Sequence, residues 1–237
     1  MRETLEQGLA ALELDKSHIS DLERFAGLML ERNQVMNLTA ITEPRDVAAL
    51  HLLDSLALMQ IAGLETETVV DVGAGAGFPG MPIAIAMPSL RVTLLDSLGK
   101  RINFLQEACE KLGLENTECI HARAEEFAAG HRETFDAAVS RAVAALPTLC
   151  ELCLPLVKVN GRMLAMKSSS TEEEIDQAGP AIQILGGQLE WIKDYTIPTT
   201  SVIHRIVCIR KVSPTPKKYP RRFALIKKSP LGVPVQK

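Results

Sequence analysis

Three glycines at alternate positions follow a run of β-branched residues, and this turn is the stretch of the chain best suited to chemistry. The run leads into Asp71, the glycines are Gly73, Gly75 and Gly77, and a helix-like apolar segment continues through Ala86. Glycine permits positive φ angles and close approach of the backbone to a ligand, because it has no Cβ. The N–H groups at the start of the following helix would point over the turn. The residues therefore predict a nucleotide-type cofactor site.

A second chemical signal is an acidic residue at the end of the next apolar run. Asp96 ends the run 91–96 and is followed by Ser97. In βαβ cofactor sites, an acid about twenty residues beyond the turn holds the ribose hydroxyls. The Gly-x-Gly-x-Gly spacing before Phe78 differs from the dinucleotide fingerprint G-x-G-x-x-G. These residues leave open a nicotinamide or flavin dinucleotide, S-adenosylmethionine, or a flavodoxin-like domain with an incidental glycine-rich loop.

The segments that position these residues alternate between strand and helix from residue 68. The pattern predicts a doubly wound α/β sheet, with strands at 68–72, 91–96, 117–121, 135–140 and 161–166 and helices at 79–87, 99–112, 146–157 and 171–185. Two last strands, 187–196 and 201–211, are joined by a loop too short for a crossover helix, so they must be antiparallel. A mostly parallel sheet ending in such a hairpin is typical of class I methyltransferases and favours S-adenosylmethionine over NAD.

The segments on either side of this sheet differ from it in composition. We expect a helical subdomain over residues 1–60, a cofactor-binding domain over 61–212, and an irregular basic tail over 213–237 that orders on its partner. The net charge of −3 is uneven, because residues 204–237 hold ten Lys or Arg and no Asp or Glu, leaving −13 on the remainder. A basic segment on an acidic body is typical of polyanion binding, although a solvated tail has the same composition.

Composition also bounds the location of the protein. No secretory signal or apolar membrane span is visible, and five cysteines without disulfide spacing suit a reducing compartment. We therefore expect a cytoplasmic protein with no membrane partner, and a monomer. Cys150 and Cys153 form a C-x-x-C inside an apolar helical pattern, so we interpret them as core thiols. The five histidines lack ligand spacing, and we predict no metal site.

The end of the fourth strand, Ser140-Arg141-Ala142, indicates what kind of acceptor such a site would serve. It lacks the Asn/Asp-Pro-Pro-aromatic loop that commonly serves exocyclic amines, and no cysteine is placed to attack a pyrimidine. A ring nitrogen such as guanine N7 needs neither, because its lone pair carries no proton. Catalysis would then consist mainly of placing the base in line with the methyl group of the cofactor. Arg141 would donate to guanine O6 or to a phosphate, or else form a structural ion pair with Asp71 or Asp136.

The sequence resembles the ribosomal RNA small subunit methyltransferase G family, also called glucose-inhibited division protein B. The resemblance covers nearly the whole chain and is carried by Asn37-Leu38-Thr39-Ala40-Ile41, His51-Leu52-Leu53-Asp54-Ser55, the turn from Asp71 to Gly80 with its Gly-Phe-Pro-Gly extension, Leu95-Asp96-Ser97, Lys100-Arg101, Arg123-Ala124-Glu125, Ser140-Arg141-Ala142 and Tyr219-Pro220-Arg221. The terminal segment departs from the family pattern around Ala224 and Ile226.

This resemblance implies an S-adenosylmethionine-dependent enzyme that methylates N7 of a guanine in 16S rRNA, with the RNA or the 30S subunit as its partner. The expected cofactor-binding residues are Gly73, Gly75, Gly77, Phe78, Asp96, Ser97, Ala124, Glu125 and Arg141, and Arg141 is the expected catalytic residue. The expected RNA-binding residues are Asn37, Lys100, Arg123, Lys167, Arg221 and Arg222. For Asn37 a helix-terminating role, and for Lys167 a solvated charge, are the alternatives. An NAD(P)-dependent oxidoreductase and a non-enzymatic RNA-binding assembly factor remain as alternative functions.

Overall fold

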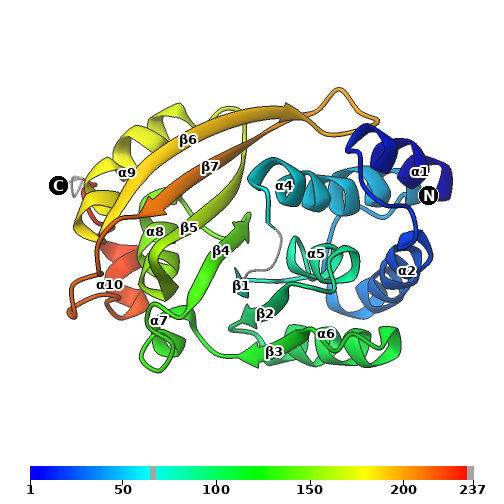
Figure 1. Cartoon of the computed structure of the whole chain (residues 1–237). Helices are drawn as coiled ribbons and strands as arrows, with labels where there is room; N and C mark the ends of the chain where they lie inside the picture. The colour runs from blue at the N-terminus through cyan, green and yellow to red at the C-terminus, as the bar shows by residue number, and fades with distance from the viewer. Residues whose placement is uncertain (65–67, 234–237) are drawn as a thin grey trace.

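A seven-stranded mixed sheet forms the centre of the molecule (Figure 1), in a computed structural model that describes residues 1–64 and 68–233. The strand order is β3-β2-β1-β4-β5-β7-β6. The parallel strands are β1 (Thr68–Val72), β2 (Arg91–Asp96), β3 (Thr117–His121), β4 (Phe135–Arg141) and β5 (Val157–Ser168). The predicted hairpin consists of β6 (Gly187–Thr196) and β7 (Ile203–Lys211), which are antiparallel to each other. Of these two strands, β7 pairs with β5, also in the antiparallel direction. The predicted architecture is confirmed, and β5 begins earlier than expected.

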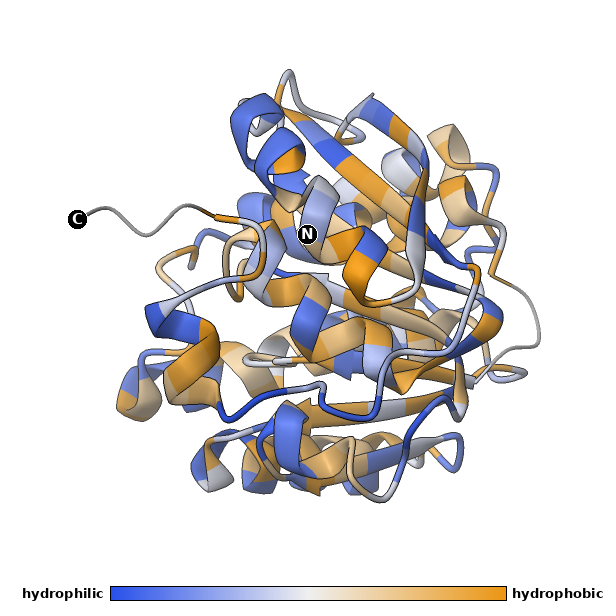
Figure 2. Cartoon of the chain, turned by 90° about the vertical axis from the view of Figure 1, so that its left-hand side faces the viewer, coloured by the Kyte–Doolittle hydropathy of each residue, from blue (hydrophilic) through white to orange (hydrophobic). Residues whose placement is uncertain are grey.

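Helices cover both faces of this sheet (Figure 1). One face carries α1 (Arg2–Ala11), α2 (Ile19–Met36), α3 (Pro44–Asp46), the π-helical η1 (Val47–Leu53), α4 (Asp54–Ala62), α5 (Gly80–Ala86) and α6 (Gly99–Leu112). The other carries α7 (Ala124–Phe127), α8 (Leu146–Cys153), the 3₁₀ turn η2 (Leu154–Leu156), α9 (Glu172–Ile184) and α10 (Phe223–Lys228). Most of these helices mix hydrophobic and hydrophilic residues (Figure 2), as expected of helices that bury one side against a sheet.

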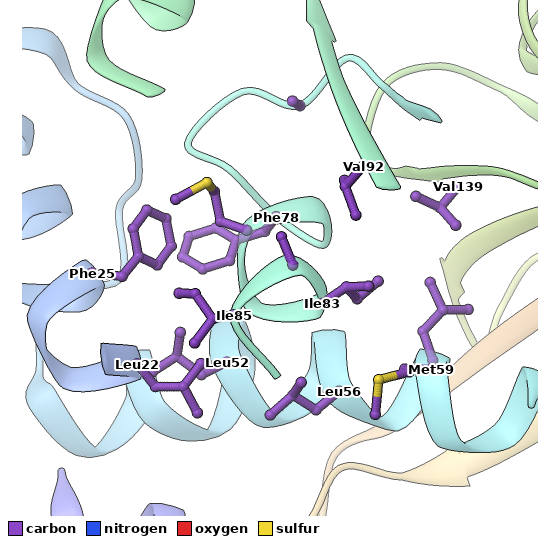
Figure 3. Close-up of a cluster of buried hydrophobic side chains, with 14 of the residues drawn as sticks. Leu22, Phe25, Leu52, Leu56, Met59, Phe78, Ile83, Ile85, Val92 and Val139 are labelled. Atoms are coloured by element: carbon purple, nitrogen blue, oxygen red, sulfur yellow. The ribbon is translucent and has the colours of Figure 1, made fainter. Parts of the chain in front are cut away.

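The predicted helices of residues 1–60 share one hydrophobic core with the sheet. Phe25 of α2 and Leu56 of α4 are fully buried, and Figure 3 shows them packed around α5, whose Ile83 and Ile85 face them. Pro44 lies at the start of α3, where the fixed φ of proline suits the first turn of a helix. That helix continues through η1 and α4 to Ala62. The N-terminal helices therefore support the start of the cofactor turn directly.

The expectation of an irregular C-terminal tail is wrong for residues 213–233. These residues include α10, and the side chains of Tyr219 and Ile226 are buried in the core beneath α8. The carboxylate of Glu151, which is fully buried in α8, accepts hydrogen bonds from the guanidinium of Arg221 at 2.6 and 2.8 Å. The abundance of Pro, Lys and Arg hid the few apolar residues that anchor this segment. Residues 234–237 lie outside the described part of the chain.

The C-x-x-C pair lies where the sequence predicted. Cys150 and Cys153 are fully buried in α8, and burial raises the pKa of both thiols. Their interpretation as core thiols is confirmed.

Candidate active site

A cavity of about 950 Å³ opens at the carboxyl ends of the parallel strands, where ligands bind in doubly wound sheets. Its wall brings together ten of the predicted site residues: Gly73, Gly75, Phe78, Asp96, Ser97, Arg123, Ala124, Glu125, Arg141 and Lys167. Five other predicted residues are not part of the wall: Asn37, Gly77, Lys100, Arg221 and Arg222. Three residues of the loop after α2 that sequence reasoning did not assign also contribute: Leu38, Thr39 and Ile41.

The glycines of the turn have two different roles. Gly73 has a φ of +78°, and a Cβ placed on it would lie 2.5 Å from a methyl carbon of Val143 in the loop after β4. The N–H of Gly73 donates to the carbonyl of Leu95 at 2.8 Å, which ties the turn to the end of β2. Gly77 instead faces the core, where a Cβ would collide with Met81 and Phe25. The structure thus gives Gly77 a packing role and leaves it out of the cavity wall.

Asp96 connects the glycine turn to the start of α6. Its Oδ2 accepts the N–H of Gly75 at 2.9 Å and its Oδ1 accepts the N–H of Leu98 at 2.8 Å. Arg101, which sequence reasoning missed, approaches the same Oδ2 at 3.4 Å and also lines the cavity. A carboxylate offers about four acceptor sites, so Asp96 retains capacity for a hydroxyl. An acceptor beside a glycine turn suits the ribose of a nucleoside cofactor, and the residues present fit S-adenosylmethionine.

The ring of Phe78 joins the turn to three other parts of the molecule. It packs edge-on against Phe25 with centroids 5.5 Å apart, as Figure 3 shows, and stacks on His51 at 4.5 Å. The guanidinium carbon of Arg141 lies 5.1 Å from the ring centroid, within range of a cation–π contact. Phe78 lines the cavity although the residue is only 4% exposed, and its ring contacts connect the surrounding elements.

Arg141 is held rigidly at the end of β4. One terminal nitrogen, Nη1, donates to the carbonyl of Leu50 and to Oδ2 of Asp54, each at 3.0 Å. The other, Nη2, lies 3.1 Å from Nδ1 of His51. A guanidinium carries five N–H donors, so Nε–H and one Nη2–H remain for a ligand. The ion pair expected as an alternative, with Asp71 or Asp136, does not form, because Asp54 takes that place.

Asp54 is the buried anion on which this cluster depends. Its side chain is fully buried, and its Oδ1 accepts hydrogen bonds from the Tyr195 hydroxyl at 2.6 Å and from Nδ1 of His204 at 3.0 Å. Burial alone would raise the pKa of Asp54, but these bonds and the charge of Arg141 outweigh burial and hold the pKa below its ordinary value. The carboxylate is therefore ionised and joins α4, β4 and the β6–β7 hairpin.

His51 serves as a neutral hydrogen-bond relay. Because Arg141 can only donate, Nδ1 of His51 must accept, and Nε2 must carry the proton. That proton points to Oγ1 of Thr39 at 2.8 Å, in the loop after α2. Burial, followed by the nearby charge of Arg141, lowers the pKa of His51 to about 4. His51 and Asp54 are three residues apart in an apolar helical segment, and that spacing of polar residues was the one sequence signal for the cluster.

Asp71 is structural rather than part of the cavity wall. It is fully buried, and its Oδ2 accepts the N–H of Gly80 at the start of α5, while its Oδ1 has no hydrogen-bond partner among residues 1–64 and 68–233. Burial raises the pKa of Asp71 to about 7 despite the Gly80 bond and the charge of Arg141.

The C-terminal segment closes the side of the cavity next to α7. Ala124 and Glu125 begin α7 at the cavity wall, as predicted. The guanidinium carbon of Arg123 lies 5.5 Å from the ring centroid of Phe223, and both residues contribute to the wall. Sequence reasoning missed Phe223 because it assigned this segment to a tail.

The remaining RNA-binding candidates divide into exposed and engaged residues. The side chain of Lys167 is 11% exposed in the cavity wall, and its Nζ donates to Glu174 at 2.5 Å and to the carbonyl of Ala144 at 2.7 Å, which leaves one of its three N–H donors. Asn37 is exposed and ends α2 in the left-handed conformation, with a φ of +50°. Three other candidates are exposed: Lys100, Arg123 and Arg222. Arg221 is engaged, because its guanidinium binds the carboxylate of Glu151.

Residues 1–64 and 68–233 contain neither a metal-binding cluster nor a membrane-spanning helix. No group of three or more His, Cys, Asp or Glu in these residues could hold a metal ion. In the same part of the chain, no helix is both long and apolar enough to cross a bilayer.

The overall fold is shared with solved structures of other proteins. The crystal structure of M. jannaschii TYW2 in complex with AdoMet matches 66% of this chain and 74% of its own with a TM-score of 0.53 at 16% identity. TrmN from Thermus thermophilus matches 67% of this chain and 48% of its own with a TM-score of 0.51 at 19% identity. At this level of identity, the likeness shows the fold alone.

Sequence comparison identifies the family. The family model for rRNA small subunit methyltransferase G (GidB) matches residues 18–203. The Ribosomal RNA small subunit methyltransferase G of Lachnoclostridium phytofermentans is 46% identical over 233 residues, which are 96% of each chain. The protein of the same name from Thermoanaerobacter sp. strain X514 is 45% identical over 92% of each chain. This chain, with its glycine turn and clamped arginine, therefore belongs to the rRNA small subunit methyltransferase G family.

Proposed function

We propose that this protein transfers the methyl group of S-adenosylmethionine to N7 of a guanine in the 16S rRNA of the small ribosomal subunit. The observation that carries the proposal is one cavity with two ends. The glycine turn and Asp96 form the first, and Arg141 with two unused donors stands at the second. Membership of the family supports the choice of rRNA as substrate and disfavours the oxidoreductase alternative.

The cofactor would occupy the end of the cavity nearest β1 to β3. We assign its methionine part to Gly73, Gly75 and the backbone of Phe78, its ribose to Asp96 and Ser97, and its adenine to Ala124 and Glu125. When bound, S-adenosylmethionine supplies a methyl group on a cationic sulfur, and transfer to N7 breaks the carbon–sulfur bond, leaves the electron pair on sulfur and removes no proton. The chain therefore needs no general base, and its contribution is placement.

Arg141 would place the acceptor. Its Nε–H and remaining Nη2–H are suited to guanine O6 or to a phosphate oxygen, and the contacts with Leu50, His51 and Asp54 prevent the fork from turning away. Because Asp54 neutralises the guanidinium, a purine that becomes cationic during transfer does not face an uncompensated positive charge. We assign Arg141 the catalytic role on this basis.

The RNA would approach over the exposed cations near the cavity mouth. Four of the basic residues beyond His204 are engaged in ion pairs inside the protein: Arg205, Arg210, Lys211 and Arg221. Five are exposed within the described residues: Lys217, Lys218, Arg222, Lys227 and Lys228. We propose that these five, with Lys100 and Arg123, contact RNA phosphates. Asn37 stays a candidate through its exposed position beside the cavity loop. We also propose that the protein acts in the cytoplasm as a monomer.

Methyl transfer can be tested with labelled S-adenosylmethionine on 30S subunits and on naked 16S rRNA. We expect label in RNA, and chain cleavage at 7-methylguanosine after borohydride and aniline treatment. The matched variant is Arg141→Lys, which keeps a cation beside Asp54 but lacks the fork, so transfer should fall while the fold persists. RNA binding by the wild type without transfer would favour the assembly-factor alternative. Label at a different atom would refute the N7 assignment.

A further inference from the structure

The far end of the cavity carries a histidine that the proposed mechanism does not use. β7 runs antiparallel to β5, so the start of β7 lies beside the end of β5, and His204 is paired in register with Ser168. Both residues line the cavity, and 28% of the His204 side chain is exposed. His204 thus faces the acceptor half of the cavity, away from the β2 and β3 ends where Asp96 and Glu125 lie.

The imidazole of His204 is oriented by the buried Asp54 and the half-buried Tyr195. Its Nδ1 lies 3.0 Å from Oδ1 of Asp54, and the ring of Tyr195 meets it edge-on, with centroids 6.4 Å apart and an interplanar angle of 89°. Since Asp54 is ionised and can only accept, Nδ1 carries a proton, and in this tautomer of the imidazole Nε2 holds the lone pair. Across residues 1–64 and 68–233, Nε2 has no hydrogen-bond partner, so it is an acceptor available to a ligand in the cavity.

We propose that Nε2 of His204 accepts a hydrogen bond from N1–H on the Watson–Crick edge of the acceptor guanine. The inference rests on the proposed function, because N7 and N1 lie on opposite sides of a purine. If N7 faces the cofactor end of the cavity, N1–H points away from it, toward the β5–β7 side. A lone pair at that position accepts from guanine but would meet the unprotonated N1 of adenine, so His204 would also contribute to base selection.

This contact would strengthen during the reaction. Methylation makes the purine cationic, and a cationic ring is a stronger N1–H donor than a neutral one. An acceptor that binds the transition state more tightly than the ground state raises kcat, with little effect on the binding of RNA or cofactor. No proton leaves the base, so Nε2 serves as a hydrogen-bond acceptor only.

The competing explanation is that His204 exists only to complete the hydrogen bonds of Asp54. Two variants separate the roles, because they replace different ring nitrogens. His204→Asn places an amide N–H close to the position of Nδ1 and keeps the bond to Asp54, but offers nothing at the position of Nε2. His204→Gln reaches the position of Nε2 with an amide oxygen and loses the donor to Asp54. His18→Asn is a control, because His18 lies outside the cavity wall.

The test measures kcat and KM for methyl transfer to 30S subunits, thermal stability, and affinity for S-adenosylhomocysteine. We expect His204→Asn to keep wild-type stability and affinity and to lower kcat by about tenfold or more, the effect of one hydrogen bond to a charged group. His204→Gln should be less stable but recover much of the rate. Wild-type kcat in His204→Asn, or a loss in His204→Gln as large as in His204→Asn, would overturn the proposal. If the wild type itself transfers no methyl to guanine N7, the proposed function fails instead.

Discussion

Asp54→Asn is the substitution that most directly tests whether a buried anion holds the active site together. All three groups that surround Asp54 are used as donors: an Nη1–H of Arg141, the Tyr195 hydroxyl and Nδ1–H of His204. Asparagine has nearly the same shape, but it presents one acceptor oxygen and one donor nitrogen. If the oxygen keeps Tyr195 and His204, the NH₂ group faces the guanidinium of Arg141, donor against donor.

The size of the effect follows from these contacts. Loss of a hydrogen bond between charged groups costs about 1.5–3 kcal/mol, and breaking a buried ion pair costs about 3–5 kcal/mol. Arg141 keeps the Leu50 carbonyl and His51 and is 15% exposed, so we expect a value near the overlap of these ranges, about 3 kcal/mol. For a chain of this length, about 2–4 °C per kcal/mol converts this value to a fall in Tm of about 6–12 °C.

Thermal and urea unfolding would measure this loss, and methyl transfer to 30S subunits would measure its consequence for Arg141. Asp46→Asn is the matched control, because Asp46 is exposed near the start of the same continuous helical stretch and its side chain has no hydrogen bond or ion pair within the described residues. We expect the control to match the wild type in both assays. A Tm for Asp54→Asn within about 2 °C of the wild type, with unchanged transfer, would show that Asp54 does not orient Arg141.

Three further changes test other parts of the site. Gly73→Ala should lower the free energy of unfolding by about 1–3 kcal/mol, because a Cβ at φ +78° would lie 2.5 Å from Val143. It should also lower the affinity for S-adenosylhomocysteine measured by calorimetry, and an unchanged affinity would contradict this prediction. Because folding lowers the pKa of His51 to about 4, His51 should contribute about 3 kcal/mol of stability that is present above pH 6.5 and lost as the pH falls toward 4. Urea unfolding of His51→Gln would test this, and a pH dependence that persists in the variant would show that His51 is not its source. Three exposed cations, Arg222, Lys227 and Lys228, can be replaced together with glutamine. For RNA binding, the slope of log K against log salt concentration should then become shallower by about 2, and an unaltered slope would show that these residues do not contact RNA.

The sheet could be predicted from sequence because its signals are local. Buried parallel strands appear as short apolar runs, and the short loop 197–200 permits only an antiparallel return. The same locality brought predicted site residues to the cavity wall, since Asp96 ends one predicted strand and Ala124 lies three residues beyond the end of another. The prediction of Arg141 at the acceptor end had the same origin, at the end of β4.

The partners of Arg141 could not be predicted in this way, because they are distant in sequence. Asp54 lies 87 residues from Arg141 and 150 residues from His204, and no local pattern connects them. The prediction for the C-terminal segment was wrong for a different reason. Its composition is that of a solvated tail, yet Glu151, which sits in an apolar helix, is neutralised by Arg221 from that segment. A lone acid in a helix predicted to be fully buried implies a distant cation, and that inference was available from the sequence.

The N-terminal helices are positioned so that they supply the hydrogen-bond acceptors of Arg141. β4 ends at Arg141, and the strand itself supplies no group that could fix a guanidinium. The required acceptors come from one helical stretch, as the Leu50 carbonyl, Nδ1 of His51 and the carboxylate of Asp54. The ring of Phe78, stacked on His51, joins that stretch to the glycine turn. Displacing these helices would therefore disturb both ends of the cavity, the one that we propose for the acceptor and the one that we propose for the cofactor.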